Sequence, residues 1–550
     1  MTPEELSRAV RDALQAALAA LSDTVDAESL PERIQLQRPK QREHGDWSTN
    51  IALQLGRRVG LAPRAIADEI AAQLRQLPSV AKAEVAGPGF LNITLDAAAA
   101  GELARTIVQR GPDFGRGHSL QGHVINLEYV SANPTGPLHI GHTRWAALGD
   151  SLVRLLRAAG ADVTAEYYIN DAGSQMDKFG ESIVARITGA DVPEGGYNGA
   201  YVAELASKVA AEDSSIATLP REEAIDQARE AGYRLQLAEI RDVLQEFGVH
   251  FDEWFSERTL HGSGAVASAV QRLRDQGHVY DEGGAVWLRT TTFGDDKDRV
   301  LIKADGSPTY FAADAAYYLS KKDRGYTEKI YLLGADHHGY VGRLKAIAAC
   351  AGDDPGVNIE ILIGQLVSVG GAKLSKRAGN IIELADLIDW IGTDAIRYSL
   401  ERYPADTPLS LDGEELRKKS NDNPVFYVQY AHARTASVAR NAADLAVARV
   451  DGFDASLLAD STEATLLALL ADYPRIVANA AQLREPHRIA RYLEELASAY
   501  HKWYDVCRVT PQGQEEVTDT HRTRLWLNDA VGQVLANGLD LLGVSAPERM

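Results

Sequence analysis

The sequence predicts an α/β protein in which a parallel-sheet nucleotide-binding domain stands between an N-terminal α+β domain and a C-terminal all-helical domain. Three observations lead to this prediction. Residues 124–148 run from a short apolar strand through a turn into a helix, residues 1–115 combine helical and strand patterns, and residues 423–550 contain four helical segments. A chain of 550 residues has room for such an arrangement, because domains average roughly 150 residues.

The N-terminal domain, residues 1–115, is predicted from helical periodicity over Leu6–Leu21 and Ile66–Leu77. A short strand pattern follows and contains Phe90 and Asn92 directly after Gly-Pro-Gly. On residue types alone, Phe90 reads as a core residue and Gly-Pro-Gly as a turn.

The strand–turn–helix element predicts a phosphate site. The apolar run from Val124 to Tyr129 is typical of a strand in a parallel sheet, and the residues from His139 to Leu148 are predicted to be helical. The free N–H groups and the positive dipole end at a helix N-terminus attract anions. His139 and His142 are three residues apart, so they share the helix face that meets the phosphate.

Two His residues at this spacing can also be a surface pair or part of a metal site. No Cys cluster or set of carboxylates and His completes a zinc shell in the sequence, so we favour phosphate binding and predict no dedicated metal site. Gly141 lets the backbone approach a ligand closely at the helix start.

His139-Ile-Gly-His142 matches the HIGH signature of class I aminoacyl-tRNA synthetases. The wider run from Glu128 to His142, EYVSANPTGPLHIGH, resembles the arginyl-tRNA synthetases in particular. This resemblance implies a Rossmann-type class I synthetase catalytic domain over residues 116–380.

Residues 371–380, GAKLSKRAGN, resemble the second, KMSKS-like signature of the class. Two flexible ammonium groups, Lys373 and Lys376, suit a loop that closes over a triphosphate and neutralises the charge that develops as pyrophosphate leaves. A solvated basic loop is the alternative for a lone KxSK, but its order after the first signature favours ATP binding, with Ser375 included. Many arginyl-tRNA synthetases have a degenerate second signature, so this well-formed motif follows the general class pattern.

A guanidinium substrate requires carboxylates that accept its forked N–H donors. Tyr310 and Asp314 are four residues apart, which places a hydroxyl and a carboxylate on one helix face. This YxxxD pattern resembles the part of the arginyl family that reads the side chain. Glu128 resembles the other acidic contact, and Asn133 the residue that holds the α-amino and carboxylate groups. Alternatively, Asp314 is an exposed helix acid and Glu128 a strand-end acid.

Asp336 and His337 follow the apolar strand Ile330–Leu333, so they are predicted at the carboxyl end of a sheet strand, where ligands gather. The family resemblance implies contacts with the ribose and, for His337, with arginine. A His-rich turn is the alternative.

The resemblance implies that the carboxylate of arginine attacks the α-phosphate of ATP, without a protein nucleophile. The predicted catalytic residues supply alignment and electrostatic stabilisation; they are His139, His142, Lys373 and Lys376. Mg²⁺ accompanies ATP and bridges phosphate oxygens with few protein ligands. The acyl group then passes to the terminal ribose of tRNA(Arg).

Three further regions complete the predicted organisation. A largely helical insertion is expected at about 176–295, with long helices over Tyr201–Phe247, and it supports the acceptor end of tRNA. A connecting stem is expected over 381–422. The helical domain over 423–550 has four predicted segments: Asn423–Val447, Ala464–Leu483, Pro486–Arg508 and His521–Leu542. One face of the third is predicted to be core; its members are Ile489, Leu493, Leu496, Tyr500 and Tyr504.

The family resemblance implies two tRNA-binding regions. The GPGFxN element resembles the end of the family's N-terminal domain, where Phe90 and Asn92 meet a base in the tRNA elbow. The helical domain resembles the anticodon binder; its expected contacts are Tyr427, Tyr430, Arg434 and Met550.

Composition constrains the remaining properties. The net charge of −20 is unusual for a nucleic-acid binder, but basic residues gather in 31–60 and 425–450. Cys350 and Cys507 are too few for a disulfide framework or a Cys-based zinc site. The chain shows no apolar run of membrane-spanning length and no secretory signal. We therefore expect a cytoplasmic monomer that binds L-arginine, ATP and tRNA(Arg) and no membrane.

Three alternatives remain at this point. The chain could be a class I synthetase for another amino acid, such as cysteine, although it lacks zinc ligands. It could be a non-catalytic tRNA-binding paralogue, although both signatures are intact. A nucleotidyltransferase would explain residues 120–380 but not the two flanking domains.

Overall fold

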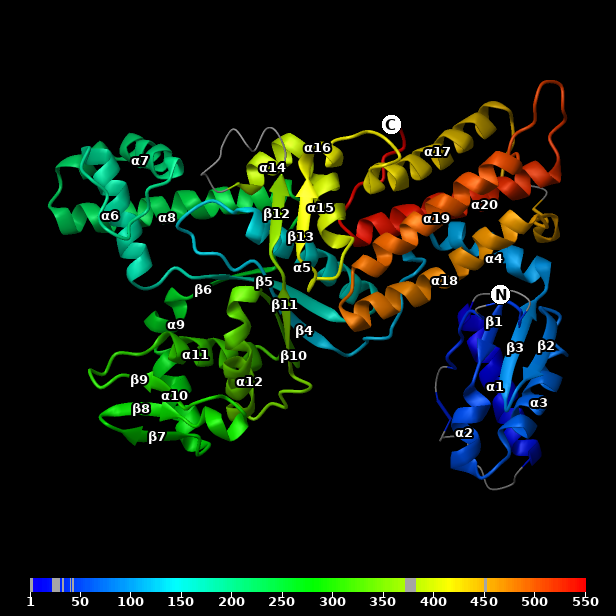
Figure 1. Ribbon diagram of the computed structural model, residues 1–550, viewed down its shortest axis with the longest axis horizontal. Coiled ribbons are helices and arrows are strands. Elements are labelled where there is room, and N and C mark those ends of the chain that lie inside the picture. Colours follow the sequence, from blue (N-terminus) through cyan, green and yellow to red (C-terminus); the bar gives the residue numbers. More distant parts are fainter. Residues whose placement is uncertain are drawn as a thin grey trace.

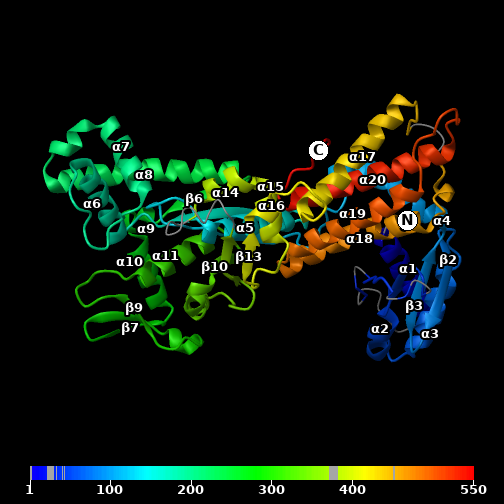
Figure 2. The same cartoon turned by 45° about the horizontal axis from the view of Figure 1, so that its top comes forward.

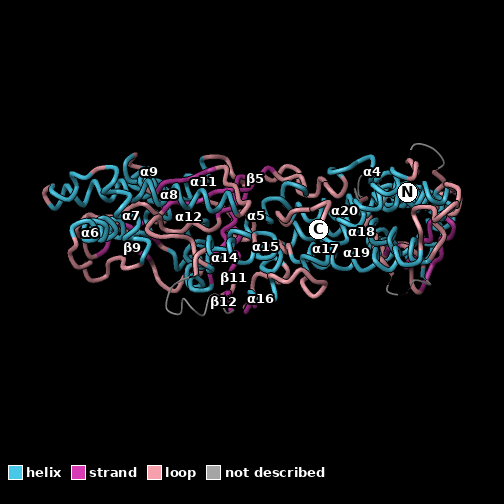
Figure 3. The backbone as a smooth tube through the Cα atoms, turned by 90° about the horizontal axis from the view of Figure 1, so that it is seen from above, coloured by secondary structure: helices cyan, strands magenta, loops and turns pink. Residues whose placement is uncertain are grey.

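The computed structural model describes residues 3–21, 30, 31, 34–39, 41, 44–370, 382–449 and 453–550. The described chain is elongated (Figure 1), with the N-terminal domain at one end and the helices α6 (Ser174–Thr188) and α7 (Ala200–Glu212) at the other. Seen from above, these parts stay at opposite ends (Figure 3). The central sheet lies between them.

The central sheet is parallel, in the order β11-β10-β4-β5-β6. Its strands are β4 (Val124–Glu128), β5 (Asp162–Ile169), β6 (Glu253–Ser256), β10 (Glu328–Gly334) and β11 (Ile359–Gly364). Later strands are added on both sides of β4, so the strand order reverses between β4 and β10. Ligands bind beyond the carboxyl ends of strands at such a switch point. The predicted nucleotide-binding fold is confirmed.

Helices cover both faces of this sheet. In β10, Ile330 and Leu332 pack in the apolar cluster that includes α5 (Ile140–Ala158). Tyr331, between them, packs instead with α11 (Tyr310–Asp323) and α12 (Val341–Cys350). Alternate residues of a strand face opposite sides of the sheet, so β10 is buried on both faces.

The region expected as a largely helical insertion is entirely helical in its first part and combines helices with short strands in its second part. Helices α6, α7 and α8 (Arg221–Glu246), with the short η4 (Ser214–Thr218), form their own apolar cluster. After Glu246 the chain returns to the main sheet as β6. It then forms α9 (Arg258–Gly262), α10 (Ala265–Asp275), η5 (Thr290–Phe293) and a small antiparallel sheet of β7 (Val279–Glu282), β8 (Ala285–Leu288) and β9 (Arg299–Ile302). Strands of four residues are too short for periodicity to reveal.

Among its described residues, the stem contains three helices and one strand, which pairs with a strand that precedes the stem. Strands β12 (Val367–Gly370) and β13 (Leu409–Asp412) pair, and the helices are α14 (Leu384–Ile391), α15 (Thr393–Glu401) and α16 (Gly413–Leu416). Arg397 of α15 is fully buried. Its guanidinium donates to the Asp150 carboxylate of α5 at 2.7 Å and to the Leu542 carbonyl at 3.0 Å. The stem thus joins the catalytic sheet to the C-terminal domain.

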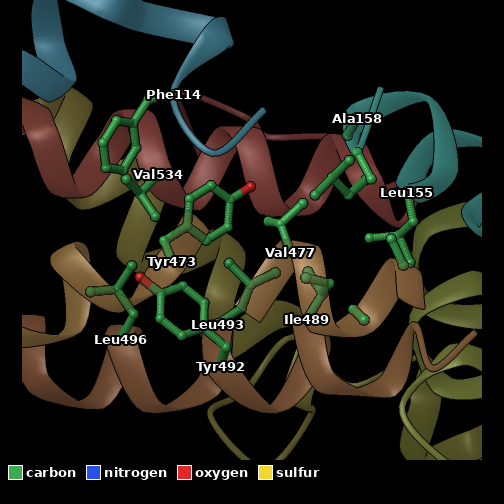
Figure 4. Close-up of a cluster of buried hydrophobic side chains, with 14 of the residues drawn as sticks. Phe114, Leu155, Ala158, Tyr473, Val477, Ile489, Tyr492, Leu493, Leu496 and Val534 are labelled. Atoms are coloured by element: carbon green, nitrogen blue, oxygen red, sulfur yellow. The ribbon is translucent and has the colours of Figure 1, made fainter. Parts of the chain in front are cut away.

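The C-terminal domain is the predicted helical bundle: α17 (Pro424–Asp444), α18 (Ser461–Leu483), α19 (His487–Val506) and α20 (Asp519–Leu541), with the short η7 (Ala455–Leu457). Its apolar core continues into the catalytic domain. Figure 4 shows Leu155 and Ala158 of α5 beside Val477 and Ile489 of the bundle. None of the described helices is long and apolar enough to span a bilayer.

The N-terminal domain packs a three-stranded antiparallel sheet, β1-β3-β2, against helices. Its elements are α1 (Pro3–Leu21), β1 (Trp47–Thr49), α2 (Ile51–Val59), α3 (Pro63–Leu74), β2 (Val80–Ala86) and β3 (Phe90–Leu95), followed by α4 (Ala97–Arg110) and η3 (Gly111–Asp113). Helix α4 packs against α20, and the domain lies beside the C-terminal bundle in two views (Figures 1 and 2). Asn537 of α20 donates to the Gly111 and Phe114 carbonyls at 3.0 Å.

Candidate active site

A cavity of about 1450 Å³ opens at the carboxyl ends of β4 and β10. Its lining comes from the turn after β4, the start of α5, the end of β10, helix α7 and the stem. Among the predicted site residues it includes Glu128, Asn133, His139, Gly141, His142 and His337. The sheet topology therefore brings together residues that are 209 positions apart at the extremes, from Glu128 to His337.

The turn after β4 is strained. Val130 and Ser131 have φ of 67° and 43°, values that L-residues and β-branched ones above all rarely adopt. Tyr129, before these two residues, remains in the core. Ala132, after them, is held by the Tyr167 hydroxyl, which accepts from its N–H at 3.1 Å and donates to its carbonyl at 3.0 Å. In this turn conformation, the Ser131 hydroxyl donates to Glu128 Oε1 at 3.2 Å.

The two His residues of the first signature cap helix α5. The Gly141 N–H donates to His139 Nδ1 at 3.1 Å, and the His139 N–H donates to His142 Nδ1 at 3.4 Å. A Cβ at position 141 would stand 2.9 Å from the His139 ring, so a larger residue there would displace the ring from its cap. A ring nitrogen that accepts a hydrogen bond carries no proton, so each neutral ring keeps its proton on Nε2.

Both rings are neutral near pH 7. Burial lowers the pKa of His139, and burial together with the neighbouring His139 ring lowers the pKa of His142 to about 4. The ring centroids are only 3.9 Å apart, so two positive charges there would repel. The pair therefore offers hydrogen-bond donors to an anion and no full charge.

The described residue that follows the second signature in the chain lies beside the start of α5. Lys373, Ser375 and Lys376 lie outside the described residues. Ile382 follows them, and its carbonyl accepts a hydrogen bond from the Ile140 N–H at 3.0 Å. Glu383 forms an isolated bridge with His139.

An acidic pocket lies at the same edge of the sheet. Burial raises the pKa of Asp314 to about 7; the hydrogen bond from the Tyr340 hydroxyl opposes this rise, and the nearby carboxylates of Glu257 and Glu128 add to it. Burial also raises the pKa of Glu257. The effects of Glu257 and Glu128 on Asp314 indicate that both carboxyl groups lie near it, where a cation would be attracted.

Tyr310 does not share this environment. It begins α11 and is 64% exposed, whereas Asp314 is half-buried; neither residue is among those that line the cavity. Tyr340, which comes from η6 (Ala335–Tyr340), bonds to Asp314 instead. The sequence does not point to Tyr340 or Glu257, because no spacing along the chain relates either residue to Asp314.

His337 and Asp336 lie in η6, directly after β10, as the sequence predicted for the segment. His337 lines the cavity. The side chain of Asp336 is outside the described part of the chain. Among the described residues, no group of three or more His, Cys, Asp or Glu side chains is placed to hold a metal ion.

The expected tRNA contacts lie on the two domains away from the cavity. Phe90 begins β3 and is 43% exposed, so it is not a core residue. Asn92, two residues later in the same strand, is half-buried. The outward position of Phe90 overturns the core interpretation and leaves its ring free to meet another molecule.

On the C-terminal domain, Phe426, Tyr430 and Arg434 follow each other at four-residue spacing along α17. The Arg434 guanidinium lies 4.8 Å from the Tyr430 ring centroid and 4.7 Å from that of Tyr504. Tyr427 contacts the His501 ring, with centroids 5.1 Å apart. We call these residues, Phe426, Tyr427, Tyr430, Arg434, His501 and Tyr504, the aromatic face.

Tyr504 was expected in the core, but it is 40% exposed, whereas Ile489, Leu493, Leu496 and Tyr500 of the same helix face are fully buried.

Next to the aromatic face, a groove of about 510 Å³ is lined by Phe426, Lys418, Lys419 and the C-terminal Met550. Aromatic rings and cations in such an arrangement suit unpaired bases and phosphates.

The fold and the signature residues define a class I aminoacyl-tRNA synthetase, and the family model of the tRNA synthetases class I (R) catalytic domain matches residues 111–186 and 233–420. The arginyl tRNA synthetase N-terminal domain matches residues 4–95, and the DALR anticodon binding domain matches residues 428–550. The chain belongs to the arginyl-tRNA synthetase family.

Relatives match this chain along its full length. An arginine–tRNA ligase of Paenarthrobacter aurescens is 64% identical, with all of both chains covered, and one of Kineococcus radiotolerans is 57% identical with the same coverage. A solved structure of Thermus thermophilus arginyl-tRNA synthetase matches the fold with a TM-score of 0.75 at 23% identity, covering 99% of this chain and 100% of that one.

Proposed function

We propose that the cavity binds arginine and ATP side by side and joins them as arginyl-adenylate before the arginyl group passes to tRNA(Arg). The carboxylate oxygen of arginine attacks the α-phosphorus of ATP, the bond to the bridging oxygen breaks, and pyrophosphate leaves. A ribose hydroxyl of the terminal tRNA nucleotide then attacks the acyl carbon, and AMP leaves. One observation carries this proposal: Glu128 and the capped N-terminus of α5 line one cavity at the switch point of the sheet, and Asp314 lies near enough to Glu128 for that carboxylate to raise its pKa.

Arginine would place its guanidinium against Asp314 and Glu128, whereas Asn133, on the turn after β4, would hold its α-amino and carboxylate groups. Selectivity against lysine follows from geometry. A compact ammonium cannot pair with all the acceptors that a forked guanidinium satisfies, and the unpaired acceptors penalise the wrong substrate. We keep Tyr310 as a predicted contact, since it lies one turn before Asp314.

The phosphates of ATP would lie at the start of α5. The Nε2–H groups of His139 and His142 supply neutral donors there, and the backbone at Gly141 adds the helix N-terminus. Lys373, Ser375 and Lys376 would complete the site, and the hydrogen bond between Ile140 and Ile382 supports this by tying the chain after the second signature to the first. ATP is expected as its magnesium complex, with the ion as part of the substrate.

The acceptor end of tRNA would enter beside α7. The Tyr201 hydroxyl of α7 donates to the Thr135 carbonyl at 2.9 Å, and Tyr201 and Lys208 line the same cavity as the first signature. The N-terminal and C-terminal domains would bind the elbow and the anticodon. The division into 1–115, 116–380, 381–422 and 423–550, the monomeric state and a cytoplasmic location remain predictions.

The value of kcat/KM for arginine is expected to fall as the pH drops below about 7. Arginine requires the ionised Asp314 carboxylate, whose pKa of about 7 in the free protein means that half of it is protonated at that pH. Above it the value should be level, and below it the loss should approach about tenfold per pH unit. His142, with a pKa of about 4, stays neutral across this range. A flat pH profile for kcat/KM would contradict the assignment.

Arg434→Ala should weaken tRNA binding by about tenfold, because stacking against a base contributes roughly 1–3 kcal/mol and the guanidinium also organises two rings of the aromatic face. Filter-binding titration of tRNA(Arg) at a fixed salt concentration measures this change. The matched control is Arg475→Ala, because Arg475 lies on α18 and forms its ion pair with Asp472, one turn earlier on the same helix. Equal losses in both variants would remove the aromatic face from the tRNA surface.

ATP–pyrophosphate exchange with each of the twenty amino acids, with and without tRNA, tests the whole proposal. Exchange with arginine alone is the expected result. Exchange with a different amino acid would move the chain to another specificity, and no exchange by folded protein that binds tRNA would leave only the binding function.

A further inference from the structure

We propose that Lys321 is a positioning residue for the arginine pocket and that it acts through Glu128. This inference rests on the proposed function of the pocket and adds a residue that no sequence motif singles out. Lys321 lies on α11, two turns after Asp314, and its side chain is fully buried. It cannot reach substrate directly, so any effect on arginine must pass through its neighbours.

The ammonium group of Lys321 has a defined place. Its Nζ donates to Glu128 Oε2 at 2.6 Å and lies 4.4 Å and 4.1 Å from the ring centroids of Tyr317 and Tyr331. Two aromatic faces stabilise a desolvated cation and restrict where it can move. Lys321 is therefore a fixed donor to Glu128.

The other buried carboxylate nearby has its own partners. Glu166 accepts from the Arg324 guanidinium at 2.6 and 3.0 Å and from the Asn126 amide at 2.7 Å, and the Tyr317 hydroxyl also donates to it. Arg324 forms its ion pair with Glu166. Among the described residues, the ion-pair partner of Glu128 is therefore Lys321.

Both oxygens of Glu128 are thereby held. Lys321 fixes Oε2 and the Ser131 hydroxyl fixes Oε1, while the residue still lines the cavity. A carboxylate oxygen accepts more than one hydrogen bond, so each oxygen keeps capacity for a guanidinium donor. Since Asp314 and Lys321 belong to one rigid helix, α11 sets the distance between the two carboxylates that receive the forked substrate.

The test compares arginine and ATP requirements in exchange assays. Lys321→Met should raise the KM for arginine by about 10- to 100-fold, as expected for loss of one partner of a buried charge pair, with the KM for ATP and the kcat at saturating arginine within about twofold. Lys321→Arg keeps a cation beside Glu128, so its KM for arginine should lie between wild type and Lys321→Met. The matched control is Lys322→Met, because Lys322 pairs with Asp353 instead.

A double-mutant cycle separates positioning from general packing. In a Glu128→Gln background, Lys321→Met should change the KM for arginine by less than about twofold, because the residue it acts on is already neutral. This double variant leaves no unpaired buried charge, so it remains a usable reference if Lys321→Met alone fails to fold. A full rise in that background, or an equal rise in the KM for ATP, would overturn the proposal. Wild-type protein without arginine-dependent exchange would instead overturn the proposed function.

Discussion

Asp314→Asn is expected to raise the KM for arginine by about 10²- to 10³-fold while the KM for ATP stays nearly unchanged. The substitution keeps the size of the side chain and an oxygen that can accept from Tyr340, but it removes the charge that pairs with the guanidinium. Truncating one side of a desolvated charged pair typically costs about 2–5 kcal/mol, and each 1.4 kcal/mol is roughly tenfold. Initial rates of exchange at varied arginine measure the change.

The control for this prediction lies on the same helix. Asp323→Asn makes the same chemical change at the far end of α11, where Asp323 is 59% exposed and pairs with Arg272. It should leave both KM values unaltered. The low-pH fall in kcat/KM should also disappear in Asp314→Asn, since the titrating carboxyl is gone. An unchanged arginine requirement in Asp314→Asn would exclude this residue from the pocket.

His142→Asn is expected to slow adenylate formation by about 10²- to 10³-fold, with arginine binding nearly unchanged. Removing one preorganised donor from a developing anionic transition state costs roughly 2.7–4 kcal/mol. An asparagine oxygen can take the place of Nδ1 and continue to accept from the His139 N–H, so the helix cap is kept while the Nε2–H donor is lost. Single-turnover formation of arginyl-adenylate measures the rate.

His142→Gln provides the matched comparison. Its amide reaches to about the position of Nε2 and restores a donor, so its rate should exceed that of His142→Asn. Thermal unfolding should move little in the asparagine variant, because loss of a helix cap, worth about 1 kcal/mol, is avoided. If the two variants were equally slow and equally destabilised, His142 would be a structural cap and not a donor to the phosphate.

The sequence predicted the features that arise from contiguous segments. The run from Val124 to Leu148 encodes a strand, a turn and a helix in one stretch, and the structure has β4 and α5 there. The four helices of the C-terminal domain were also predicted to within a few residues, because each has long 3.6-residue periodicity. Local patterning suffices where an element is long and one of its faces is buried.

Periodicity failed where burial depends on distant parts of the chain. It placed Tyr504 in the core because the residue continues the stripe of Ile489 and Leu493, but only the packing of α19 against α17 decides where that stripe becomes uncovered. Short strands were also hard to predict from the sequence. The four residues of β6 are recognisable only by their pairing with β5.

The sequence by itself determined the class of chemistry, because each signature is encoded in contiguous residues and the first lies directly after an apolar strand, at the start of a helix. The protonation states and ion pairs of the site residues, in contrast, could be found only from the tertiary structure. The neutral His pair, the raised pKa of Asp314, the proximity of Glu257 and the pairing of Lys321 with Glu128 all depend on burial and on contacts across up to 193 positions of the chain. Desolvation and Coulomb interactions act through space, so no spacing along the sequence encodes them.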